Sequence, residues 1–98
     1  MIYQGNNLVV FNSGGLMEAF RWNEWNRDHA TKHGCSITEI EMVLNRKIHG
    51  FPIKNGDEKW LVEGRGTGDR MIRVIFVRDP DRTIFVIHAM PLTTRRRR

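Results

Sequence analysis

Three apolar segments in the second half of the chain are joined by very short connections. They run from Lys59 to Arg65, from Met71 to Arg78 and from Thr83 to Ala89, and they are rich in the Val, Ile, Phe and Trp residues that favour strands. Residues 66–69 and 79–82 between them read Gly-Thr-Gly-Asp and Asp-Pro-Asp-Arg, which are turn sequences. Because such short connections join antiparallel neighbours, the segments predict an antiparallel meander.

Alternation along these strands assigns side chains to opposite faces of the sheet. Ile72, Val74 and Phe76 share one face, and Arg73 lies on the other. On the preceding strand, one face is shared by Leu61, Glu63 and Arg65.

Two short helices are predicted before the strands. The first spans Asn23 to His33, with Asn23 as its N-cap and Gly34 in the left-handed position after its end. The second opens at Ser36, where Glu39 completes the pattern of a capping box, and ends near Asn45. Its apolar stripe consists of Ile37, Ile40, Val43 and Leu44.

These elements predict an α+β fold with a single domain. Two N-terminal helices are expected to pack on one face of a three- to four-stranded antiparallel sheet, whose fourth and weakest strand lies between Lys47 and Ile53. The 40% apolar content suffices for one core, and Trp25 and Trp60 are expected to pack the first helix against the sheet. Residues 17–98 are predicted to form the domain, and residues 1–16 an N-terminal extension that is partly disordered.

The charge of the chain is concentrated at its C-terminus. The formal net charge is +5, but the last four residues are arginines, and without them twelve basic residues face eleven acidic ones. Affinity for a polyanion then depends on how charges are placed on the domain or on the tail, where Arg95 and Arg96 are the expected nucleic-acid contacts.

No membrane-spanning stretch or secretory signal is recognisable, so a cytoplasmic protein without membrane association is expected. The lone Cys35 excludes an internal disulfide and a CxxC motif.

Two groups of side chains match the needs of metal-independent RNA cleavage. That reaction requires a base for the 2′-hydroxyl proton, an acid for the leaving 5′-oxygen, and cations for the charge on phosphorus. Lys32 and His33 end the first helix and form one group. The second group, on or beside the sheet, consists of Glu63, Arg65, Arg70, Arg73 and His88. If they converge, the arginines form a phosphate clamp, with Arg65 as a nucleic-acid contact and the other residues of both groups as the catalytic set.

Each of these residues also has a structural explanation. Lys32 and His33 suit the negative end of a helix dipole, and Glu63 can pair with Arg73 across two strands. His29 and His33 have the HxxxH spacing of zinc sites, but the protease glutamate and a third ligand are missing. No metal and no cofactor are therefore expected. The tryptophans have two interpretations, as platforms for stacked bases or as packing residues.

The run Trp22-Asn23-Glu24-Trp25-Asn26, followed by His29, Lys32-His33-Gly34 and the Ser36/Glu39 helix start, resembles the N-terminal signature of the BrnT-like toxins of bacterial type II toxin–antitoxin systems. The similarity continues through Gly64-Arg65, Gly68, Arg70, the strand MIRVIFV and Ile87-His88-Ala89 to Thr93 and the closing arginines. It covers residues 20–98.

This resemblance implies a fold related to the RelE-like ribonuclease toxins and an RNA substrate. It also implies a ribbon-helix-helix antitoxin as partner, and contact with operator DNA only through that antitoxin. By the family pattern, Lys32 holds phosphate and His33 transfers a proton. The chain departs from the commoner pattern at Trp25 and His29 in the first helix, and at Met90, where many members carry an arginine. Two functions follow: an endoribonuclease neutralised by its antitoxin, or a non-catalytic BrnT-like interaction or nucleic-acid-binding module in which Met90 marks the lost arginine.

Overall fold

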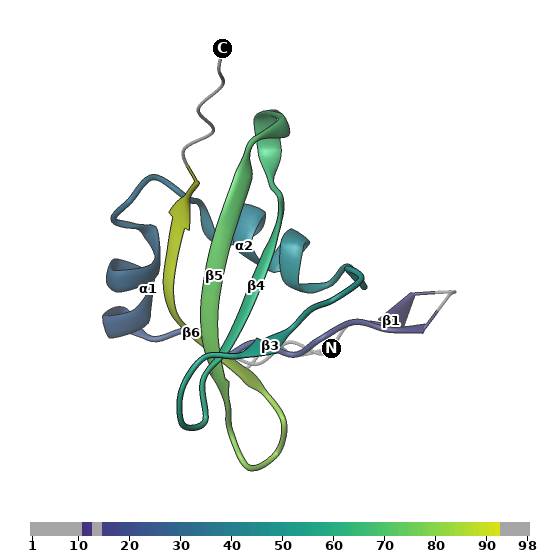
Figure 1. The fold of residues 1–98 in the computed structure, drawn as a ribbon. Coiled ribbons are helices and arrows are strands. Elements are labelled where there is room, and N and C mark those ends of the chain that lie inside the picture. Colours follow the sequence, from purple (N-terminus) through teal and green to yellow (C-terminus); the bar gives the residue numbers. More distant parts are fainter. Residues whose placement is uncertain (1–10, 13–14, 93–98) are drawn as a thin grey trace.

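A four-stranded antiparallel sheet forms the centre of the fold in the computed structural model, which describes residues 11–12 and 15–92 (Figure 1). The strands lie in the order β3-β4-β5-β6, and every pairing between neighbours is antiparallel. Their bounds are Ile53–Lys54 for β3, Trp60–Arg65 for β4, Met71–Arg78 for β5 and Ile84–Pro91 for β6. The predicted meander and the α+β class are confirmed, with four strands in the sheet.

The weakest predicted strand differs from the observed one. A strand from Lys47 to Ile53 is wrong, because only Ile53–Lys54 pairs with β4. The Phe51 amide instead donates to the carbonyl oxygen of Ile48 in a turn. Residues 66–69 turn as predicted, as the single-turn 3-10 helix η1 (Thr67–Asp69).

The first helix, α1 (Glu24–Thr31), begins at its predicted cap. The Asn23 side chain accepts from the backbone amide of Asn26, and the Asn26 side chain accepts in return from the amide of Asn23. This reciprocal pair is a capping box that fixes the start of the helix. Gly34, with φ of +99°, takes the left-handed conformation expected after the helix end.

The second helix, α2 (Ile37–Leu44), has only half of its predicted capping box. The Ser36 hydroxyl accepts from the backbone amide of Glu39, as expected. The Glu39 carboxylate does not return to the cap, because it accepts hydrogen bonds from Thr67 and Arg70. The helix ends at Leu44 with Asn45 as its C-cap, as predicted.

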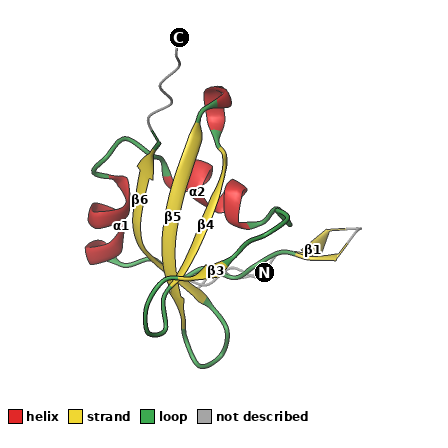
Figure 2. Ribbon diagram, viewed as in Figure 1, coloured by secondary structure: helices red, strands yellow, loops and turns green. Residues whose placement is uncertain are grey.

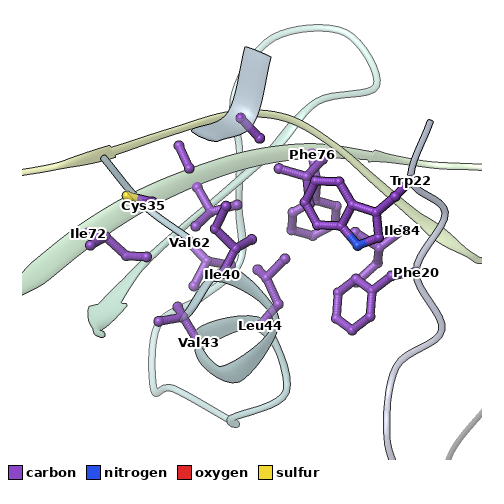
Figure 3. Close-up of a cluster of buried hydrophobic side chains, with 14 residues drawn as sticks. Phe20, Trp22, Cys35, Ile40, Val43, Leu44, Val62, Ile72, Phe76 and Ile84 are labelled. Atoms are coloured by element: carbon purple, nitrogen blue, oxygen red, sulfur yellow. The ribbon is translucent and has the colours of Figure 1, made fainter. Parts of the chain in front are cut away.

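The two helices cover the sheet at different places, as Figure 2 shows by colour. α2 packs on β4 and lies behind the strands in this view, whereas α1 runs alongside β6 (Figure 1). The core lies between α2 and the sheet, and Figure 3 shows Ile40, Val43 and Leu44 of α2 close to the buried strand residues. Neither helix in the described part of the chain is long and apolar enough to cross a membrane.

The expectation that tryptophans pack the first helix against the sheet holds in part for Trp25 and is wrong for Trp60. Trp25 on α1 is 49% exposed but stacks on Phe85 of β6, and the buried contacts of α1 with β6 come from Asn26 and Ala30. Trp60 is half-buried at the edge of the core on β4, away from α1. The buried tryptophan is Trp22, which Figure 3 shows among the core side chains. Its indole nitrogen donates to the carboxylate of Glu41 on α2.

A bulge in β6 changes which side chains face the core. Ile75 pairs with His88, and the next residue of β5, Phe76, pairs with Val86, so Ile87 is an extra residue without a partner. Ala89 is fully buried beyond the bulge, as Val86 is before it. The bulge thus shifts the alternation by one residue and turns His88 away from the core.

The expected N-terminal extension forms a short hairpin where it is described. β1 (Phe11–Asn12) pairs antiparallel with β2 (Gly15–Leu16). Residues 1–10, 13–14 and 93–98 lie outside the described part, and with them the predicted contacts Arg95 and Arg96.

Candidate active site on the open face of the sheet

The face of the sheet turned away from α2 carries three of the predicted site residues, Glu63, Arg73 and His88. We call it the open face and define it by Leu61 and Glu63 on β4, Arg73 and Ile75 on β5, and His88 and Met90 on β6. Strand register places them in two rows, Leu61-Ile75-His88 and Glu63-Arg73-Met90. All six side chains are half-buried, so they are held by neighbours and still reach solvent.

His33 and His88 meet at the margin of the open face. His33 follows α1, His88 lies on β6, and their ring centroids are 5.2 Å apart in an edge-to-face arrangement. His33 is exposed, whereas His88 is partly shielded by the sheet. Two imidazoles from elements far apart in the sequence thus share one accessible site, which fits a pair of proton-transfer groups.

The surroundings of His88 favour its neutral form. Partial burial lowers the pKa of His88 below the ordinary histidine value, and the positive charges of His33, Lys32 and Arg73 lower it further. Arg73 lies on the same face of the neighbouring strand, one row away from His88, and Lys32 directly precedes His33 in the chain. A neutral imidazole beside two permanent cations can accept a proton while the cations attract an anion.

Arg73 is held in place by the predicted cross-strand partner. Its Nε and one terminal nitrogen donate to the same carboxylate oxygen of Glu63, at 2.9 and 2.8 Å. The Arg73 side chain remains 40% exposed. Glu63 therefore orients the guanidinium, and this ion pair occupies the carboxylate that was a candidate general base.

Arg70 does not join this group. It donates to both carboxylate oxygens of Glu39, at 2.8 and 3.2 Å, and to the carbonyl oxygen of Gly34. The Glu39 side chain is 1% exposed and lies on α2, on the opposite side of the sheet from Arg73. Arg70 therefore does not converge with Lys32, His33 and Arg73, and instead it ties α2 to the β4–β5 connection.

Arg65 is also separate from the imidazoles. Its side chain is mostly exposed and pairs with Asp69 at 2.9 Å within the same connection. The three arginines of the expected clamp therefore contact three different carboxylates, and only Arg73 faces the imidazole pair.

The HxxxH spacing does not bring two imidazoles together. His29 stacks on Trp25 with ring centroids 3.9 Å apart, and His33 contacts His88 instead. Within the described residues, no three His, Cys, Asp or Glu side chains gather as metal ligands.

Two placements in the site were not predicted from the sequence. Met90 lies directly opposite Arg73 on the open face, so an apolar side chain stands where the resemblance expects an arginine. The second is the stack of His29 on Trp25, two residues four positions apart on α1. That spacing is visible in the sequence.

Comparison of the chain with models of protein families, with curated protein sequences and with solved structures gives no match.

Proposed function

We propose that this protein is the toxin of a type II toxin–antitoxin pair and acts as a metal-independent endoribonuclease of the BrnT-like, RelE-related class. The observation that carries the proposal is the His33–His88 pair, 5.2 Å between ring centroids, with Lys32 next to His33 in the chain and Arg73 on the strand beside His88. The resemblance of residues 20–98 to BrnT-like toxins supports the same chemistry from the sequence side.

Each group has a role in the proposed reaction. His88, whose pKa is lowered, accepts the proton of the RNA 2′-hydroxyl as its oxygen attacks phosphorus. His33 donates a proton to the 5′-oxygen as the bond between phosphorus and that oxygen breaks, leaving a 2′,3′-cyclic phosphate and a 5′-hydroxyl. Lys32 and Arg73 stabilise the negative charge that builds on the phosphoryl oxygens, and Glu63 positions Arg73.

The partner in this proposal is a ribbon-helix-helix antitoxin in the cytoplasm. The open face has no helix over it within the described chain, and its side chains are accessible. An antitoxin that covered this face would block the imidazole pair, and operator DNA would be reached only through the antitoxin. The C-terminal arginines Arg95 and Arg96 remain proposed contacts for the RNA backbone.

The position of Met90 favours the second candidate function, a non-catalytic BrnT-like interaction or nucleic-acid-binding module. Met90 occupies the place next to Arg73 where a second cation would face a phosphate. Without that cation, the surface can bind RNA while stabilising the transition state less.

Cleavage of a labelled single-stranded RNA in the presence of EDTA tests the nuclease. We expect product with a 2′,3′-cyclic phosphate end, no cleavage of an all-2′-deoxy oligonucleotide, and loss of about a hundredfold or more in rate for His33→Ala and for His88→Ala. Expression of the wild type should arrest growth, and either variant should relieve the arrest.

His49→Ala is the matched control, because His49 is an exposed histidine in the loop after α2. It should cleave like the wild type. RNA binding without any cleavage by the wild type would instead establish the non-catalytic module.

A further inference from the structure

A cavity of about 540 Å³ lies beside the loop of residues 46–52 that follows α2. Part of its wall belongs to the apolar core, through Leu44, Val62, Phe76 and Ile84 (Figure 3). These side chains are on the face of the sheet that carries the core, whereas His88 is on the open face, so the cavity is separate from the candidate active site. Its volume is within the range of small-molecule binding sites.

The loop wall of the cavity is fixed by packing against the sheet. Ile48 and Phe51 are partly buried against the core, and the Phe51 amide donates to the carbonyl oxygen of Ile48 at 3.0 Å. Ile48 also lies so close to Gly64 of β4 that a Cβ at position 64 would be 2.6 Å from its Cδ1 atom. Glycine at this position thus lets the loop pack on the strand, and the cavity is formed before a ligand enters it.

Basic side chains outnumber acidic ones in the lining of the cavity, where Glu18 supplies the one carboxylate among the described residues. The two lining arginines differ in their partners. Arg78 is paired with Glu18 at 3.2 Å. Within the described chain, Arg46 pairs with no carboxylate, and one of its terminal nitrogens donates to the carbonyl oxygen of Arg65 at 2.7 Å. This hydrogen bond positions the guanidinium, and its remaining edge suits the two oxygens of a carboxylate.

We propose that this cavity binds a small organic acid, in which an apolar body ends in one carboxylate. The apolar body lies against the core residues of the wall and against Ile48 and Phe51, where its burial stabilises the complex. The carboxylate accepts hydrogen bonds from Arg46, which is exposed, so the charged end stays in contact with water. One negative charge is sufficient, because Glu18 already neutralises Arg78. The site does not rest on the proposed nuclease.

A titration with decanoate, followed by the methyl resonances in NMR spectra, tests the site on the unaltered protein. We expect decanoate to shift the methyl resonances of Leu44, Val62 and Ile84, which line the cavity. Leu61 and Ile75 should keep theirs, because they lie on the open face. 1-Decanol has the same chain without the charge. It should shift the same lining residues but bind about tenfold more weakly, because it lacks the charge-assisted hydrogen bonds.

Arg46→Ala separates the contribution of the guanidinium from that of the apolar wall. It should reduce the affinity for decanoate about tenfold and leave the affinity for 1-decanol unchanged, so the preference for the charged ligand disappears. Arg27→Ala is the matched control, because Arg27 is an exposed arginine on α1. It should keep the wild-type preference.

Three results would overturn the site. The first is the absence of decanoate-induced shifts at the cavity lining, whether or not Leu61 and Ile75 respond. The second is equal affinity of the wild type for decanoate and 1-decanol, and the third is an unchanged preference in Arg46→Ala. Cleavage of RNA is scored separately: binding of decanoate in the cavity without RNA cleavage retains the cavity site and removes the nuclease, and the reverse result does the opposite.

Discussion

His88 is the residue whose chemistry depends most on its neighbours. Its imidazole is partly covered by the sheet, and His33, Lys32 and Arg73 add positive charge around it. Both effects disfavour the imidazolium, so the pKa of His88 falls below the ordinary histidine value. In the proposed nuclease, this shift favours the neutral imidazole that accepts the 2′-hydroxyl proton.

Removal of one neighbouring charge should move the titration of His88 in a defined direction. In Lys32→Ala, one of the interactions that lower the pKa is lost, so the pKa of His88 should rise toward its ordinary value. The acidic limb of the pH–rate profile, where the base becomes protonated, should shift to higher pH together with the His88 ring resonances in NMR spectra.

Lys47→Ala, an exposed lysine in the loop after α2, serves as the comparison and should leave both titrations in place. An unchanged pH profile in Lys32→Ala would remove Lys32 from the site.

The link between α2 and the β4–β5 connection is built on one buried carboxylate. Glu39 accepts hydrogen bonds from Arg70 and from the amide and hydroxyl of Thr67, and a Cβ on Gly66 would overlap its carboxylate. Hydrogen bonds from Arg70 are the main cause that lowers the pKa of Glu39, and those from Thr67 add to it, while burial acts in the opposite direction. Glycine at position 66 is thus required by the close approach of two elements.

Glu39→Gln should lower the free energy of unfolding near neutral pH by about 2 kcal/mol, because buried charge-assisted hydrogen bonds are weakened. A carboxyl group with a lowered pKa in the folded state stabilises the fold above its ordinary pKa, and this contribution is lost as the pH falls through the folded value. The difference between wild type and variant should therefore shrink in acid. Urea unfolding over a pH series measures it.

Glu58→Gln makes the same change at an exposed turn residue and should alter stability by no more than a few tenths of a kcal/mol. A constant penalty for Glu39→Gln at every pH would contradict the assigned charge state.

In the described part of the molecule, the apolar core lies on only one side of the sheet, under α2. α2 and the sheet enclose the buried apolar residues, while the open face keeps charged and titratable side chains at partial exposure. In a chain of this size the stability rests on a few core contacts, because a small domain buries a limited share of its surface. The open face is therefore free to carry chemistry, and the core contributes most of the folding free energy.

Truncation of a single core side chain should show this division. Ile40 on α2 is fully buried, and Ile40→Ala should cost about 3 kcal/mol in the free energy of unfolding. Ile53 on the edge strand β3 is 47% exposed, and Ile53→Ala should cost about 0.5 kcal/mol or less. Equal losses in denaturant titrations would contradict the assigned core.

Local patterns predicted much of the fold. The strand segments between turns, Asn23 and Ser36 as helix caps, and Gly34 after α1 all depend on neighbours in sequence, and the structure confirms them. Arg73 on the face opposite Ile72 follows from the same alternation. Such features are determined within a few residues, so the chain alone contains the information.

The composition of the site was decided by tertiary structure. Alternation from Ile84 and Val86 points His88 into the core, and only the bulge at Ile87 turns it outward to meet His33. That bulge depends on how β6 registers with β5, and the position of Arg70 depends on a carboxylate 31 residues away. The sequence by itself determined the elements and their caps, because these are local; register and ion pairing between distant residues are not, so only the folded chain decided which groups meet.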